Sequence, residues 1–254
     1  MIPEKAPITD RRQRRTLLLG LGFLVFCVLQ LLAYQLWLNY QEEIVDAETK
    51  TRNYAAIFET RLDATLRRTD AILQGLSRSL PAQALARPAS ASYAASLGET
   101  LDAHLLHFDD LAGLRVFDRR GDMRYSSNGA HTAPTNVADR DYFRFLQNRP
   151  QSGLLFSEVI VSRTTGRPSL IIARALQDPH GVFLGLVTAA LDLDHYVEIF
   201  RLVDVGNNGV ISFRRSDDHR QVVRWPSGPG KMNQELDPGH PLRPPMARGD
   251  RTGT

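Results

Sequence analysis

Three runs rich in Val, Ile and Leu, between residues 154 and 191, constrain the fold more than any other part of the chain. Their sequences are LLFSEVIVSR, PSLIIARALQ and VFLGLVTAAL, and only TTGR and DPHG separate them. Gly166 and Gly181 supply the positive φ that tight turns need, and Pro179 presets φ at an inner turn position. Connections this short join antiparallel strands, so the stretch predicts a three-stranded antiparallel meander.

A hairpin and two helices are predicted to complete this unit. Residues 111–127 (LAGLRVFDRRGDMRYSS) carry apolar positions on both sides of a DRRGD turn, which is typical of two paired strands. After a loop at 128–138, the segment DRDYFRFLQ predicts a short helix at the lip of the meander, and residues 93–108 predict another. The result is an α+β fold: a five-stranded antiparallel, PAS-like sheet with helices covering one side.

The N-terminal segment is typical of a membrane anchor. Residues 1–15 form a basic tail, and residues 16–40 carry no charge, with 22 nearly continuous apolar residues from Leu17 to Leu38. That run makes roughly 33 Å of helix, enough to cross a bilayer, and it is longer than the usual core of a cleaved signal peptide, which is the alternative. Because arginines precede the span and acids follow it, we expect a single-pass inner-membrane protein with a cytoplasmic N-terminus and a periplasmic C-terminal bulk.

A long helix is predicted over residues 41–80, where apolar residues recur at steps of three and four until Pro81 ends the element. It could pack on one domain, serve as a stalk that pairs with a second copy in a homodimer, or do both. Farther along, residues 196–226 predict a helix followed by another strand–turn–strand, the start of a second PAS-like unit. Residues 227–254 are rich in Pro and Gly, and we expect them to be a truncated end that leaves this unit incomplete.

This order of elements resembles the double Cache (PDC) sensor domains of bacterial signalling proteins, most of all the N-terminal sensor region of membrane-bound diguanylate cyclases. The matching stretches are DRDYF at 139–143, TGRPSLIIAR at 165–174, GVFLGLVTAALDLDHY at 181–196, RLVDVGNNGVISFRR at 201–215 and VVRWP at 222–226.

The resemblance implies that residues 81–195 form the membrane-distal unit, which holds the ligand, and that residues 196–226 begin the membrane-proximal one. It also implies a signalling output domain beyond a second span. Neither a GGDEF or GGEEF signature nor a second apolar span occurs in this sequence, so we expect no enzymatic activity in the chain. The function predicted is that of an extracytoplasmic ligand sensor, cut off before its output domain.

The candidate ligand-binding residues come partly from the resemblance and partly from the residues themselves. In amine- and amino-acid-sensing relatives, an arginine followed by two aromatic residues, here Arg140, Tyr142 and Phe143, holds a carboxylate and packs its carbon skeleton. The alternative is that Asp139 caps a helix while both rings belong to the core.

Two further candidates lie in the meander. Arg174 interrupts an apolar strand on the face of Ile172 and Leu176, where a charge needs a partner or a ligand. Asp192 ends the last strand, where the resemblance implies a carboxylate for a ligand amine; the alternative is that it caps the following helix. The expected ligand is a small molecule: an amino acid, an amine or a small carboxylate.

Other classes of function find little support in the sequence. The formal net charge is only +3, and the N-terminal arginines are explained by topology, so no nucleic-acid partner is expected. Cys27 is the single cysteine, and no motif for a metal, a cofactor, a phosphate loop or a catalytic nucleophile occurs. The alternatives left open are a membrane-tethered periplasmic hydrolase and a scaffold that dimerises without sensing.

Overall fold

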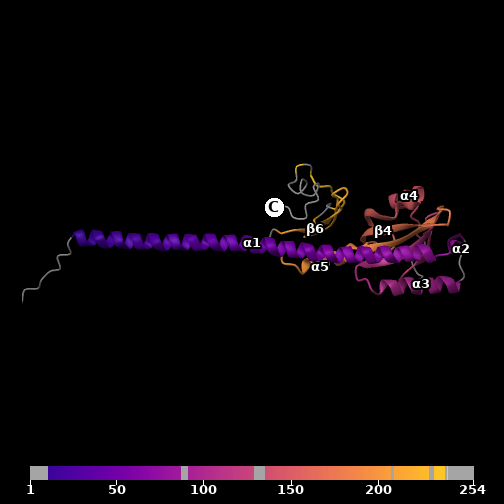
Figure 1. Ribbon diagram of the computed structural model, residues 1–254, viewed down its shortest axis with the longest axis horizontal. Coiled ribbons are helices and arrows are strands. Elements are labelled where there is room, and N and C mark those ends of the chain that lie inside the picture. The colour runs from indigo at the N-terminus through magenta and orange to yellow at the C-terminus, as the bar shows by residue number, and fades with distance from the viewer. Residues whose placement is uncertain are drawn as a thin grey trace, which may run out of the picture. The chain divides into compact units, whose positions relative to one another are not determined.

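A computed structural model describes residues 11–86, 91–128, 135–206, 209–228, 232–237 and 239, and Figure 1 shows their arrangement with some of the elements labelled. The chain divides into two compact units, residues 1–58 and residues 59–254, which are considered separately. The expected basic tail at 1–15 falls mostly outside the described residues.

The first unit contains helix α1 (Arg11–Ser79) as far as Phe58, and the last turns of this helix belong to the second unit. The uncharged stretch of α1 exposes its large apolar side chains, among them Leu19 and Phe23, which are 74% and 70% exposed. Among the described residues, α1 is the one helix that is long enough and apolar enough to cross a membrane. The same helix continues through the predicted stalk and ends at Ser79, before Pro81, as the sequence indicated.

The second unit contains the predicted five-stranded sheet, in the order β2-β1-β5-β4-β3 with every neighbouring pair antiparallel. The strands are β1 (Leu111–Asp118), β2 (Met123–Ser126), β3 (Leu154–Val161), β4 (Pro168–Gln177) and β5 (Phe183–Asp192). Gly166 and Gly181 adopt φ of 69° and 81° in the two meander turns, which confirms the role predicted for them.

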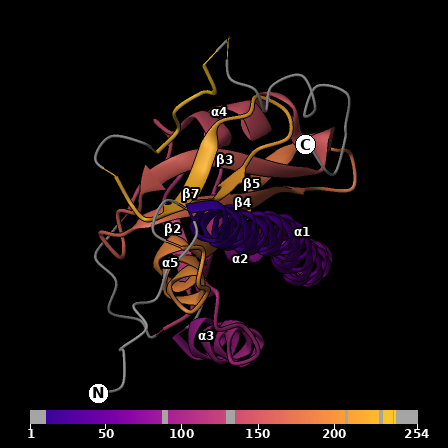
Figure 2. The same ribbon diagram turned by 90° about the vertical axis from the view of Figure 1, so that its left-hand side faces the viewer.

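Helices cover both faces of this sheet, whereas the sequence predicted cover on one side only. Helix α4 (Asp141–Asn148) lies on one face, and α2 (Ala82–Ala86), α3 (Ala91–Leu105) and the last turns of α1 lie on the other (Figures 1 and 2). The physical reason is the composition of β4. Seven of its ten residues are apolar, and they point to both faces, so the strand has a surface to bury on each side of the sheet.

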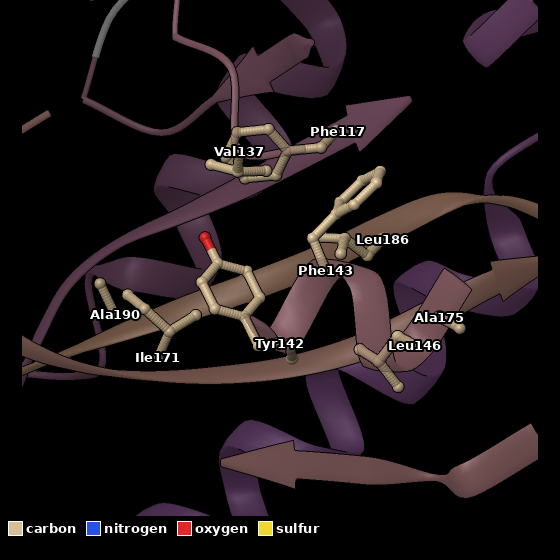
Figure 3. Packing of buried hydrophobic residues seen from close by; sticks show 10 residues of the cluster. Phe117, Val137, Tyr142, Phe143, Leu146, Ile171, Ala175, Leu186 and Ala190 are labelled. Atoms are coloured by element: carbon tan, nitrogen blue, oxygen red, sulfur yellow. The ribbon is translucent and has the colours of Figure 1, made fainter. Parts of the chain in front are cut away.

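The core under α4 joins the helix to the sheet. Tyr142, Phe143 and Leu146 project from α4 onto strand residues such as Ile171 and Leu186 (Figure 3). Two short elements were not predicted: α2 and the 3-10 turn η1 (Pro150–Ser152).

The last elements are α5 (Leu193–Arg201) and a two-stranded sheet of β6 (Ile211–Arg214) and β7 (Gln221–Trp225). Phe213 of β6 packs edge-on against Tyr196 and Phe200 of α5, with ring centroids 5.4 and 4.9 Å apart. Residues 232–237 of the Pro/Gly-rich end also dock, since the backbone of Gln221 exchanges hydrogen bonds with Asn233 and Gln234.

Candidate ligand-binding pocket

A small cavity lies between α4, the segment that precedes it and the sheet. Its volume is about 30 Å³. Four apolar side chains line it: Phe117, Val137, Ile160 and Ile171. Five lining residues carry a hydroxyl: Thr135, Tyr142, Ser162, Thr164 and Thr188. Three lining residues are arginines: Arg115, Arg140 and Arg163.

The start of α4 sets the positions of two predicted ligand residues. Arg140 is the N-cap residue, with extended φ and ψ of −78° and 140°, and makes no side-chain cap hydrogen bond. Its half-buried guanidinium donates to the backbone oxygen of Val161 at 3.2 Å. Tyr142, two residues on, is 7% exposed and lines the cavity. Burial raises the pKa of the Tyr142 phenol to about 12, so its hydroxyl stays a hydrogen-bond donor at neutral pH.

An ion pair forms the outer rim of the cavity. Arg163 donates to both carboxylate oxygens of Asp139, at 2.8 and 2.6 Å. This two-pronged pair lowers the pKa of the Asp139 carboxyl to about 2. Asp139 therefore belongs to the rim, and the expectation that it caps the helix is wrong because Arg140 occupies the cap position.

Arg115 is the most buried of the three arginines that line the cavity, and the sequence analysis missed it. The residue is 6% exposed, and its Nε has no hydrogen-bond partner among the described residues. No carboxylate in the described part of the chain forms an ion pair with it, and burial lowers the pKa of its guanidinium from the ordinary value. Its signal in the sequence was available: a charge inside the apolar strand LAGLRVFD, the argument that was applied to Arg174.

The other three predicted ligand residues lie elsewhere. Phe143 points into the core, where its ring stands edge-on to Phe183 with centroids 5.6 Å apart. Asp192 is the N-cap of α5: its carboxylate accepts from the Asp194 backbone at 3.0 Å. Arg174 lies on the opposite face of the sheet, so the structure brings together only Arg140 and Tyr142 of the predicted set.

A larger hollow of about 640 Å³ lies near the C-terminal end of α1 and the β4–β5 turn. Two of its three charged lining residues, Arg174 and Asp178, already have partners in the chain. Arg174 pairs with Asp70 at 2.5 Å, and Asp178 accepts from the backbone of its own turn. We therefore place the candidate site at the smaller cavity, where a buried charge lacks a partner.

A metal site finds no support in the part of the chain that the structure describes, where no group of three or more His, Cys, Asp and Glu residues gathers.

The sheet order and the helices on both of its faces define a fold class, the PAS-like α+β fold that sensor domains of the Cache type share. Comparison with solved structures confirms this fold. The extracellular domain of rpHK1S-Z16, described as a histidine kinase, superimposes with a TM-score of 0.62 at 24% identity, over 76% of each chain. The sensor domain of the V. cholerae histidine kinase DctB gives 0.53 at 18%, over 80% of this chain and 76% of that one.

A chemoreceptor domain has the same fold. The ligand-binding domain of Campylobacter jejuni Tlp3, solved with L-valine, gives a TM-score of 0.53 at 12% identity, over 72% of this chain and 71% of that one. Neither the scan of protein-family models nor the search of curated proteins gives a match. The resemblance to Cache sensor domains is thus confirmed at the level of the fold, while its association with diguanylate cyclases stays a prediction.

Proposed function

We propose that this chain is the extracytoplasmic sensing part of a membrane-anchored signalling protein, and that it binds a small molecule in the cavity beneath α4. The observation that carries the proposal is the buried side chain of Arg115, which lines this cavity; among the described residues it forms no ion pair, and its Nε has no hydrogen-bond partner. A buried, unpaired charge is costly, and such a cost is typical of a site that a ligand completes.

Arg140 and Tyr142 are the other proposed ligand contacts. The guanidinium of Arg140 can turn from the Val161 backbone toward an anionic group, and the Tyr142 hydroxyl can donate a hydrogen bond. The cavity of about 30 Å³ has space for only two or three water-sized groups. A larger ligand would need the Arg163–Asp139 pair at the rim to open.

The signal is proposed to leave the pocket through β1. Asp110, next to the first residue of this strand, accepts hydrogen bonds from Thr65 of α1 at 2.7 Å and from Tyr196 of α5 at 2.9 Å. This buried carboxylate ties the strand that carries Arg115 to both helices. A ligand that shifts β1 would therefore shift these helices too, and packed elements in such transitions slide by about 1–2 Å.

The remaining parts of the proposal concern the setting of this domain. The apolar half of α1 is proposed to cross the inner membrane once, with the N-terminus in the cytoplasm and the second unit in the periplasm. Dimerisation is proposed to involve α1, and the output is proposed to be a diguanylate cyclase. The solved neighbours support the sensing module, since they include domains of histidine kinases and of a chemoreceptor, and the cyclase output rests on the sequence resemblance alone.

The test is calorimetric titration of the full chain in lipid nanodiscs against amino acids, amines and small carboxylates. We expect saturable one-site binding of a member of this panel without its conversion, and weaker binding after Tyr142→Ala. Turnover of a bound compound would indicate an enzyme instead. No binding across the panel, by a chain that is folded and dimeric, would indicate a scaffold.

A further inference from the structure

We propose that the ligand of this cavity is a short organic carboxylate that carries no ammonium group, and that Arg115 is the residue that selects it. This inference rests on the proposed sensing function and narrows the class of ligand. The proposed ligand differs from that of one solved neighbour, which binds L-valine. L-Valine carries both a carboxylate and an ammonium group.

The first step is the charge balance of the cavity. Three guanidinium groups line it, and of these Arg163 is neutralised by Asp139. Arg115 and Arg140 form no ion pair with any described residue, so the site carries an uncompensated positive charge. An anion is the partner that this charge favours, and a carboxylate fits the planar fork of a guanidinium.

The second step excludes an ammonium group. None of the described residues that line the cavity is an aspartate or a glutamate. Asp192, expected to hold a ligand amine, caps α5 and lies 3.8 Å from Arg167. The carboxylate of Asp139 is held by both prongs of Arg163. A ligand ammonium would therefore be repelled by the arginines, with no carboxylate available to compensate.

The third step concerns the carbon skeleton. The side chains of Phe117, Val137, Ile160 and Ile171 make part of the lining apolar, which suits methyl or methylene groups better than the oxygens of phosphate or sulfate. The closed volume of about 30 Å³ sets the size of the skeleton. Compounds such as acetate, propionate, pyruvate and malonate are the expected range, with the rim pair opening for the longer ones.

The geometry also indicates what the buried Arg115 does to the stability of the domain. Thr188 is its register partner on β5, and the Thr188 side chain lines the same cavity, so the two sit side by side on the floor of the site. A buried cation without a partner destabilises the ligand-free fold, and a bound carboxylate would remove that penalty. Arg115 should then lower the stability of the ligand-free domain and raise that of the ligand-bound domain.

The experiment is calorimetric titration of the full chain in nanodiscs, with the four carboxylates, glycine, alanine, L-valine, methylamine, phosphate and sulfate as separate probes. We expect saturable binding of at least one carboxylate, and binding at least tenfold weaker for its amino analogue. Arg115→Met should weaken the carboxylate at least 30-fold, in line with the loss of one partner from a buried charge pair. The same variant should raise the melting temperature of the ligand-free chain by about 2 °C or more.

The matched control is Arg144→Met, because Arg144 lies on the exposed side of α4. This variant should leave both the affinity for the carboxylate and the melting temperature of the ligand-free chain unchanged. Arg115→Lys should restore only part of the affinity, because an ammonium cannot reproduce two parallel hydrogen bonds. Tighter binding of an amino acid, an amine or an inorganic anion would overturn this inference and leave the sensor proposal standing. Binding of no probe at all would overturn both. An Arg115→Met variant that keeps its affinity, or melts earlier, would show that the residue is structural.

Discussion

Arg174 of β4 and Asp70 of α1 form an ion pair, with 2.5 Å between Nη2 and Oδ1, on the face of the sheet opposite the candidate pocket. The partners are 104 residues apart in the sequence, and their side chains are 19% and 38% exposed. The pair therefore fastens the last turns of α1 to the middle of the sheet. It also satisfies the charge that interrupts the apolar strand, without any ligand.

The first prediction concerns this ion pair. Asp70→Asn should lower the free energy of unfolding by about 1 kcal/mol, between the values typical of exposed and of buried pairs. That loss corresponds to a melting temperature lower by about 2–4 °C. Affinity for the ligand should change less than threefold, because the pair lies on the other face of the sheet. Thermal unfolding and calorimetric titration of the full chain measure the two effects.

A control for this substitution lies in the same helix. Asp63 pairs with Arg67 at 2.7 Å, and their side chains are 56% and 78% exposed. Asp63→Asn should leave the free energy of unfolding nearly unchanged, because exposed ion pairs contribute little to stability. If Asp70→Asn is as harmless as Asp63→Asn, the Arg174 pair contributes nothing to the fold. If it abolishes binding while stability is kept, Arg174 belongs to the ligand site after all.

The second prediction is a flat pH profile. The pKa of Asp139 is lowered to about 2, so the stabilisation by its pair with Arg163 is present above the ordinary carboxyl value and lost as pH falls toward 2. The pKa of Tyr142 is raised to about 12, so the stabilisation by its buried phenol is present below the ordinary value near 10 and lost above it. Neither group changes its charge near neutrality, and we expect affinity for a carboxylate to vary less than about twofold from pH 6 to 8.

Calorimetric titration in buffers of different ionisation enthalpy checks this profile, since it also counts the protons taken up on binding. We expect fewer than about 0.1 protons per ligand at pH 7. A tenfold change in affinity with a midpoint near 6.5 would instead indicate a histidine in or near the site, which the described lining does not contain.

Much of the sheet could be predicted from sequence because its signals are local. The alternation of apolar runs with Gly166 and Gly181 gives the meander, and the polar-aromatic segment before it gives α4. Whether a charged strand residue has a partner is not a local property. Arg174 and Arg115 look alike within their strands, but only Arg174 meets a carboxylate, supplied by Asp70 from a distant helix. The helices that cover the second face of the sheet, α2, α3 and the last turns of α1, were not predicted for the same reason, because packing between distant segments is not a local property either.

The third prediction is topology. A reporter that is active only outside the cytoplasm, fused after Arg215, should be active, because the arginines before the apolar half of α1 hold that end inside. As a control, replacing the four arginines at positions 11, 12, 14 and 15 by glutamate should lower this activity, since it removes the charge bias. Activity of a cytoplasm-only reporter at the same position would rule out a periplasmic sensor. Fusion activities are compared at equal protein levels.

The fourth prediction concerns how the chain after β7 holds the outer edge of the five-stranded sheet. Strand β3 is an edge strand, with a bulge between Phe156 and Val159. The side chain of Asn233 accepts from the Val159 backbone N–H at 2.8 Å and donates to its carbonyl at 2.7 Å. An edge with free backbone groups invites pairing with other chains, so this contact protects the strand.

Asn233 has φ of 57°, a left-handed conformation that asparagine and glycine tolerate better than alanine. Asn233→Gly should therefore lose only the two hydrogen bonds, about 1–2 kcal/mol, whereas Asn233→Ala should lose about 1 kcal/mol more through backbone strain. Hydrogen exchange at the Val159 amide is the direct readout, and it should quicken in both variants while the amides of β5, in the middle of the sheet, stay protected. Equal protection of Val159 in the wild type and in Asn233→Gly would show that the edge does not depend on this side chain. Faster exchange across the whole sheet would show that residues 232–237 stabilise the entire unit and not its edge alone.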